Sequence, residues 1–206
     1  KLHLAGDRIM PSRVISTLAC SRARYLGRRE IGLTSLMTQI RPVTATDSQD
    51  WLHMRCALWP EGSEGEHRDE IERFFADQLR NPLQVLLAVD DAGAPVGFVE
   101  LSLRSYAEDC LTDRVAYLEG WYVVPEARRR GVGRALVRAA EDWAKEHGCA
   151  EFASDALLDN HTSAAAHRAL GFEETVQIRC FRKVVDPTKL PLDISRRAGV
   201  HSPEKD

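Results

Sequence analysis

Several features that would place the chain in a specialised class of protein are missing from its sequence. There is no run of 18 apolar residues, so neither a membrane-spanning helix nor a membrane partner is expected. The five cysteines show no CxxC spacing, which argues against a disulfide framework and a zinc site. We therefore expect no metal and a reducing, cytoplasmic compartment. A Gly-Lys-Ser/Thr step is also absent, so the chain carries no Walker-type phosphate loop.

The net charge of −3 is divided unevenly along the chain. Residues 1–36 carry seven Lys/Arg and two Asp/Glu, whereas residues 37–186 carry 17 Lys/Arg and 26 Asp/Glu. An acidic domain is unfavourable for binding nucleic acid, so no nucleic-acid partner is expected. It favours a cationic small molecule as partner, although the need for solubility would also explain much of the charge.

The ends of the chain differ in composition from its middle. Residues 1–36 are rich in Arg and Ser and poor in acids, and we interpret them as an N-terminal extension outside the core. Met37 directly precedes a strand-like segment, so the core domain is expected to span residues 37–186. Residues 187–206 contain three prolines and a polar end, which is typical of a loosely ordered C-terminal tail.

Between these ends the hydrophobic pattern alternates between the periods of helices and of strands. Capping and turn residues divide the region, among them Thr46–Gln49 with capping-box spacing and a hairpin turn at Asp90–Gly93. The expected elements, in chain order, are a strand at 38–43, a helix closed by Pro60, a helix ended by Asn81-Pro82, strands at 84–89, 95–103 and 115–124, a helix at 131–147, a strand at 151–154, a helix at 160–170 and a strand at 176–185. This order predicts an α+β fold in which helices cover both faces of a mixed, mostly antiparallel sheet.

The loop from Arg128 to Gly133 lies between the expected strand at 115–124 and the helix that follows it. A helix N-terminus has unpaired backbone N–H groups and a partial positive charge, and glycines there let a phosphate approach closely. Arginines at positions 128, 129, 130 and 134 add forked donors that suit phosphate oxygens. The pattern favours a phosphate-binding loop, and the alternative is a solvated arginine patch before an ordinary helix.

The sequence Arg128-x-x-Gly131-x-Gly133 resembles the pyrophosphate-binding motif of the GNAT superfamily of acetyltransferases. The resemblance extends over about residues 39–185. It implies acetyl-CoA as co-substrate, bound where the strand ending at Val123-Val124 separates from its neighbour at a bulge. It also implies that the Val123 N–H stabilises the negative charge that develops on the thioester oxygen. The cofactor-binding residues that it implies are Trp121, Tyr122, Val123, Arg128, Arg129, Arg130, Gly131, Val132, Gly133, Arg134 and Asn160.

Four further segments resemble one branch of this superfamily, the aminoglycoside 6′-N-acetyltransferases. They are Leu58-Trp59-Pro60, Leu118-Glu119-Gly120, Ala153-Ser154-Asp155 and the run from His167 to Thr175. The resemblance implies that Trp59 and Tyr106 pack on sugar rings. It implies that Glu119 and Asp155 bind the amino groups of a cationic aminoglycoside, and that the protein is a homodimer.

The acceptor amine must lose a proton before it attacks the thioester, and Glu119 is the expected base. We place Asp155 and His167 in the catalytic group as well. His167 stands where many members of the superfamily have the tyrosine that reprotonates the leaving thiolate, and histidine can donate a proton near neutral pH. Structural roles are the alternatives: Trp59 as a core aromatic at a helix end, Glu119 on a solvent face, and His167 as a packed helix residue.

The sequence therefore predicts an acetyl-CoA-dependent N-acetyltransferase acting on a primary amine, with the 6′-amine of an aminoglycoside antibiotic as the expected acceptor. Two other functions stay open at this point. One is acetylation of a polyamine or a protein N-terminus, which the acidic domain suits almost as well. The other is a non-catalytic module that binds acetyl-CoA.

Overall fold

The computed structural model describes residues 38–186, and these form one five-stranded sheet. The strands lie side by side in the order of the chain, antiparallel from β1 to β4, with β5 parallel to β4. A parallel pair requires a crossover, which the helix between β4 and β5 supplies. The strands are β1 (Gln39–Pro42), β2 (Gln84–Val89), β3 (Pro95–Arg104), β4 (Val115–Val123) and β5 (Glu151–Ser154).

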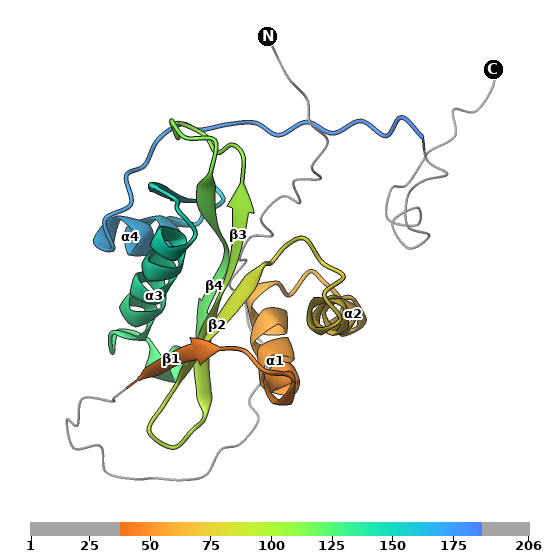
Figure 1. Ribbon diagram of the computed structural model, residues 1–206, viewed down its shortest axis with the longest axis vertical. Coiled ribbons are helices and arrows are strands. Elements are labelled where there is room, and N and C mark those ends of the chain that lie inside the picture. Colours follow the sequence, from red (N-terminus) through yellow and green to blue (C-terminus); the bar gives the residue numbers. More distant parts are fainter. Residues whose placement is uncertain (1–37, 187–206) are drawn as a thin grey trace. The chain divides into compact units, whose positions relative to one another are not determined.

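Helices cover both faces of the sheet (Figure 1). The long helix α3 packs on β2, β3 and β4 from one side, and α1 packs on β3 and β4 from the other, with α2 against α1. This arrangement confirms the predicted α+β fold with a mixed, mostly antiparallel sheet. The helices are α1 (Ser48–Leu58), α2 (Glu64–Phe75), α3 (Val132–Glu146) and α4 (His161–Ala169), with short 3-10 turns η1 (Ala45–Asp47) and η2 (Pro125–Ala127).

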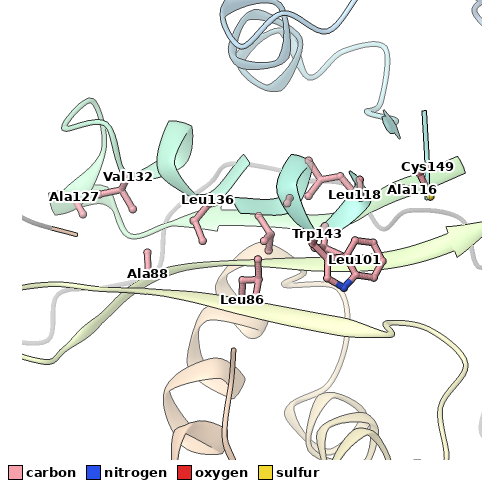
Figure 2. Close-up of a cluster of buried hydrophobic side chains, with 13 residues drawn as sticks. Leu86, Ala88, Leu101, Ala116, Leu118, Ala127, Val132, Leu136, Trp143 and Cys149 are labelled. Carbon is pink, nitrogen blue, oxygen red and sulfur yellow. The ribbon is translucent and has the colours of Figure 1, made fainter. Parts of the chain in front are cut away.

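The surface of the sheet that α3 covers, here called the α3 face, is apolar. Val132, Leu136, Ala140 and Trp143 recur at helical spacing and are all buried. Figure 2 shows this side of α3 directed at the side chains of the strands below it. Complete burial of a side chain such as Leu136 contributes about 1.5–3 kcal/mol relative to an exposed position. The α3 face thus anchors the helix whose N-terminus follows the arginine-rich loop.

The opposite surface, the α1 face, combines an apolar core with buried charges. Trp51 is fully buried there, and Arg55 and Glu100 are 6% and 2% exposed. Arg55 Nε lies 3.0 Å from Glu100 Oε1, its Nη2 lies 2.6 Å from Glu70 Oε2, and Trp51 Nε1 donates to Glu100 Oε1 at 3.0 Å. Burial raises the pKa of Glu100, and the Arg55 charge opposes that shift. Charges are seldom buried to this degree unless they are paired, as these are.

Helix α2 is shorter than the sequence pattern predicts. It ends at Phe75, and the expected end at Asn81-Pro82 is wrong. Asp77 adopts a left-handed conformation with φ 55°, and the Gln78 N–H donates to the Arg73 carbonyl at 2.9 Å, which closes the last turn. The apolar pattern continues beyond this point without the helix, because a backbone cap ends a helix independently of side-chain periodicity.

The predicted last strand, 176–185, is also wrong. None of its residues belongs to a strand, and Val176, Ile178 and Phe181 are 52%, 53% and 90% exposed. Their β-branched and aromatic side chains favour an extended strand, but a strand is stable only when a neighbour pairs with its backbone. Within residues 38–186 no strand pairs with this segment.

Residues 38–186 were searched for membrane-spanning helices and for groups of metal-ligating side chains. In residues 38–186, no helix combines the length and the apolar character needed to cross a lipid bilayer. In the same residues, no three His, Cys, Asp or Glu side chains form a group that could hold a metal ion. The predicted N-terminal extension, 1–36, and the predicted tail, 187–206, lie outside the described residues.

Candidate active site

Glu119 is the extra residue of a β-bulge between β3 and β4. Glu100 pairs with Gly120 and Leu101 pairs with Leu118, so Glu119 has no partner on β3. A bulge redirects the side chain of the extra residue, and bulges are frequent beside active sites. On the other side of β4, the parallel ladder with β5 ends one residue earlier. The resemblance to the superfamily implied a bulge in the strand that ends at Val123-Val124, and the structure has a bulge in the middle of β4, at Glu119.

Two residues of β3 hold the Glu119 carboxylate. Arg104 donates from Nε to Oε1 at 3.1 Å and from Nη2 to Oε2 at 2.6 Å, and Ser102 Oγ donates to Oε1. The side chains of Arg104 and Glu119 are 14% and 15% exposed. Glu119 therefore does not lie on a solvent face. A forked arginine–carboxylate pair of this kind fixes orientation better than a single contact.

Tyr117 connects this pair to Asp155. The Arg104 Cζ lies 3.2 Å from the centroid of the Tyr117 ring, and the Tyr117 hydroxyl donates to Asp155 Oδ1 at 2.6 Å. Burial, reinforced by the hydrogen bond to Asp155, raises the pKa of Tyr117, so this hydroxyl keeps its proton at neutral pH. The two carboxylates singled out from the sequence, Glu119 and Asp155, thus belong to one chain of contacts.

Past the end of its ladder with β5, β4 has an open edge on that side. The Val124 N–H donates to the Val96 carbonyl at 3.0 Å. Because backbone groups in an antiparallel ladder alternate in direction, Trp121 and Val123 direct theirs away from β3 and toward the open edge. The Val123 carbonyl accepts there from Arg128 Nε at 2.9 Å. An edge of this kind can pair with an extended ligand that carries amide groups.

The loop before α3 has the backbone geometry of an anion-binding helix start. Gly131 is left-handed, with φ 88°, and Arg129 occupies the same sparsely populated region with φ 60°. α3 has no acidic residue in its first turn and no side-chain cap. Its first N–H groups therefore lack a side-chain partner and are available to an anion. The arginines at 128, 129, 130 and 134 are all exposed around this point, whereas Val132 is buried and anchors the turn.

Trp121 packs directly against this loop. A Cβ at position 133 would lie 2.7 Å from the Trp121 Cζ2, so only glycine leaves room for the ring. The same ring meets the His167 ring edge-on, with centroids 5.5 Å apart. Trp121 thus contacts both the loop and α4. Tyr122 points to the α1 face, where its ring lies 6.3 Å from Phe98 and 5.7 Å from the Arg128 guanidinium carbon.

His167 is connected to the end of β5 through Ser154. His167 Nδ1 lies 2.8 Å from the Ser163 carbonyl, which only accepts, so Nδ1 carries a proton. Its Nε2 lies 3.0 Å from Ser154 Oγ, which lies 3.2 Å from the Leu118 carbonyl. Ser154 has a single hydrogen. It donates either to a neutral His167 or to Leu118, and in the second case a protonated His167 donates to Ser154.

The remaining predicted residues are placed as follows. Asn160 caps α4, and its Oδ1 accepts from the Ser163 N–H at 3.0 Å. Tyr106 is 61% exposed in the loop after β3. Trp59 is only 6% exposed, with its ring stacked on His67 and the Arg55 guanidinium 5.1 Å from its centroid. The Trp59 ring is therefore mostly enclosed by its neighbours, and its contact with a sugar ring stays a prediction.

Trp59 has a different neighbour of interest, the bulge itself. A Cβ at Gly120 would lie 2.7 Å from the Trp59 Cη2, so the indole fills the place of a side chain next to Glu119. The contact partners of Glu119, Asp155 and His167 were not identified from the sequence: Ser102, Arg104, Tyr117 and Ser154. The alternation of Ser102 and Arg104 along β3 is a signal that they share a face, but only the strand register places them opposite Glu119.

An open strand edge beside a glycine-containing, arginine-rich helix start, with one carboxylate at a bulge, is the arrangement expected of an acyl-CoA-dependent transferase. A model described as the Acetyltransferase (GNAT) family matches residues 49–172. The chain belongs to the GNAT family of acetyltransferases.

Similar proteins place it more narrowly. It is 57% identical over 144 residues to an aminoglycoside N(6′)-acetyltransferase type 1 of Klebsiella aerogenes, covering 70% of this chain and 95% of the relative. It is 43% identical to the protein of that name from Acinetobacter baumannii over 145 residues, covering 70% and 97%. Within the family, the chain groups with these acetyl-CoA-dependent transferases.

Solved structures agree with this grouping. The crystal structure of aminoglycoside antibiotic 6′-N-acetyltransferase AAC(6′)-Ih from Acinetobacter baumannii matches with a TM-score of 0.67 and 41% identity, covering 72% of this chain and 99% of that one. AAC(6′)-Iy, solved in complex with the bisubstrate analogue CoA-S-monomethyl-acetylneamine, matches with a TM-score of 0.66 and 35% identity, covering 71% and 98%.

Proposed function

We propose that the chain acetylates the 6′-amine of an aminoglycoside antibiotic and so confers resistance to it. The observation that carries the choice of acceptor is the position of Glu119, a carboxylate presented by a bulge beside the open edge of β4. A second carboxylate, Asp155, follows the end of β5. Two anionic groups beside an acyl-binding edge suit an acceptor with several ammonium groups. The names of the relatives support the same acceptor.

The residues around α3 fit acetyl-CoA, which supplies the activated acetyl thioester. The N–H groups at the start of α3 and the four exposed arginines would bind the pyrophosphate. Trp121 would pair through its backbone groups with the amides of the pantetheine arm, and Asn160 and Tyr122 would line its path. The Val123 N–H would face the carbonyl oxygen and stabilise its negative charge during transfer.

Glu119 is the base in this proposal. The acceptor ammonium gives a proton to the Glu119 carboxylate, and the free amine attacks the acetyl carbon. The carbon–nitrogen bond forms, the attacking nitrogen gives its second proton to solvent water, and the carbon–sulfur bond breaks, which leaves the CoA thiolate. Asp155 holds a second ammonium of the acceptor, oriented by its hydrogen bond from Tyr117. Tyr106 is exposed enough to pack on a sugar ring.

His167 is the proposed acid for the thiolate, acting through Ser154. In the protonated arrangement, the Ser154 hydroxyl turns from the Leu118 carbonyl to the sulfur and gives it a proton, while His167 gives its Nε2 proton to Ser154. The hydrogen bond from Nδ1 to the Ser163 carbonyl holds the ring in the required orientation throughout. The result is neutral His167, which regains a proton from solvent.

The proposal also covers the bounds of the core domain, the cellular compartment and the oligomeric state. The core domain spans residues 37–186, with 1–36 and 187–206 outside it. The protein works in the cytoplasm, as the free cysteines among the described residues support. It is a homodimer, as the resemblance to the aminoglycoside branch implies; light scattering of the purified protein would measure the mass of the assembly.

The test is a comparison of acceptors with release of the CoA thiol as the readout. Kanamycin, an analogue carrying a hydroxyl in place of the 6′-amine, and spermidine are each offered with acetyl-CoA. We expect turnover with kanamycin and at least a hundredfold lower kcat/KM with the hydroxyl analogue, since the reacting amine is missing. Turnover with spermidine alone would mean that the acceptor is a polyamine and that the chain is still an acetyltransferase. No release of thiol with any amine would leave only a module that binds acetyl-CoA.

A further inference from the structure

The Glu119 carboxylate is occupied in this structure by a cation of the protein itself. Arg104 donates to both oxygens, at 3.1 and 2.6 Å, and Ser102 adds a third hydrogen bond to one of them. A carboxylate with both oxygens engaged has little room for another donor at the same hydrogen-bond distance. An incoming ammonium group therefore has to replace part of this set before it can give its proton to Glu119.

Arg104 belongs to a row of groups that has the charge pattern of an occupied cation site. Along the row lie Glu119, Arg104, the Tyr117 ring and Asp155, each in contact with the next. The guanidinium carries one positive charge against two carboxylates and lies on an aromatic face, as a bound ammonium ligand would. The row has a formal charge of −1 with Arg104 in place. Without Arg104 its formal charge is −2.

A second arginine–glutamate pair on the same face, Arg55 with Glu100, is more completely enclosed than the pair of Arg104 with Glu119. Arg55 is 6% exposed, lies between Glu100 and Glu70, and has the rings of Trp51 and Trp59 against it. Arg104 has one carboxylate and one ring. It is the last residue of β3 and is followed by exposed residues, Ser105 and Tyr106, so it lies at the end of the strand and not in the middle of the sheet.

We propose that Arg104 is an internal counter-ion that the ammonium group of the acceptor displaces from Glu119. Arg104 then determines specificity: a neutral acceptor cannot displace it, so only a cationic acceptor gains access to the base. The proposal rests on the function given above, in that the acceptor is an amine deprotonated by Glu119.

The test compares Arg104→Met with the wild-type protein and with Arg41→Met. Arg41 is the matched control, because it also makes a forked pair with a carboxylate, at 2.8 Å to each oxygen of Asp47, away from β4. We expect the KM for kanamycin to fall about tenfold in Arg104→Met, equal to about 1.4 kcal/mol of competition removed. The KM for acetyl-CoA stays unchanged in both variants, and Arg41→Met keeps both values.

A smaller side chain at position 104 gives a second readout. In Arg104→Ala, free guanidinium ion at constant ionic strength occupies the vacated place and inhibits competitively against kanamycin. In the wild-type protein the same concentration of guanidinium has little effect, because the place is filled. Arg104→Lys, which keeps the charge without the fork, is expected to have a KM between those of the wild type and Arg104→Met.

Two results would overturn the proposal. One is a KM for the amine that stays the same or rises in a folded Arg104→Met protein with normal acetyl-CoA binding, since Arg104 would then be a fixed support of Glu119. The other is equal guanidinium inhibition of wild type and Arg104→Ala. A failure of the proposed function looks different: the wild-type protein would not acetylate kanamycin. The Arg104 comparison would then be made with the amine that it does acetylate.

Discussion

The two faces of the sheet are built from different kinds of contact. On the α3 face, one amphipathic helix buries a continuous apolar stripe, and the functional groups lie at the start of that helix. On the α1 face, apolar side chains share the interior with Arg55 and Glu100, and the functional carboxylate comes from a bulge in the strand. The proposed cofactor site therefore depends on regular structure, whereas the proposed acceptor site depends on an interruption of it.

This difference has an energetic consequence. An apolar interface tolerates changes that keep its volume, because its contacts are not directional. A buried ion pair does not, because removal of one partner leaves an uncompensated charge in a dry environment. The α1 face should consequently be the more sensitive of the two to single substitutions, in stability as well as in activity.

The largest expected effect is on stability, at Glu100. Its replacement in Glu100→Ala leaves the Arg55 guanidinium buried at 6% exposure without its partner on the sheet. We expect a loss of about 3–5 kcal/mol in the free energy of unfolding, measured by urea denaturation. The double variant Arg55→Met/Glu100→Leu removes both charges and should recover much of that loss. Equal stability of the single and double variants would contradict the explanation that an unpaired buried charge causes the loss.

The next effect is on catalysis, at Glu119. Glu119→Gln keeps the size of the side chain and an acceptor oxygen for Ser102 but removes the base. We expect kcat/KM for kanamycin to fall 100- to 1,000-fold, or about 2.7–4 kcal/mol, within the range of general base catalysis. The KM for acetyl-CoA should not change. Glu146→Gln at the exposed end of α3 is the control, and a similar loss there would remove the special role of Glu119.

A smaller effect is expected on the α3 face, at Gly133. The added methyl group in Gly133→Ala meets the Trp121 ring at 2.7 Å, and the ring or the loop has to shift. Such overpacking costs about 1–3 kcal/mol, and we expect the KM for acetyl-CoA to rise about tenfold with little change in the KM for kanamycin. Gly65→Ala in α2, where no atom lies within 4 Å, is the matched control. If only the KM for kanamycin changed, Trp121 would contact the acceptor and not acetyl-CoA.

The same contrast between the faces explains which parts of the site could be predicted from the sequence. The loop before α3 is local: glycines, arginines and a strand–helix step lie within a few residues, so spacing alone favoured a phosphate-binding loop there. Glu119 was identifiable as a charge in an otherwise apolar strand. Its partner Arg104 was not, because 15 residues separate them and the bulge sets their register. The packing of Trp59 against Gly120 could not be read from local pattern either, because 61 residues separate the two.

Ser154 and His167 lie on the α3 side of the sheet, beside Trp121, and the smallest effect is expected there. Ser154→Ala removes the hydroxyl that connects His167 to the end of the β4–β5 ladder. We expect kcat to fall about tenfold with both KM values unchanged, a modest loss because a thiolate with an ordinary pKa near 8.5 leaves with little help. Ser154→Thr keeps the hydroxyl and should keep most of the turnover.

The decisive measurement for this pair is a double-mutant cycle of kcat. If His167 and Ser154 deliver one proton in sequence, either substitution breaks the same path. Ser154→Ala/His167→Asn should then be no slower than the worse single variant, since groups that act as a unit are not additive. If instead the fold losses in kcat of the two single variants multiply in the double variant, then His167 acts independently of Ser154. It would hold Trp121 and α4 in place through the ring contact at 5.5 Å. In that case the acid would have to be sought among groups that face the open edge of β4.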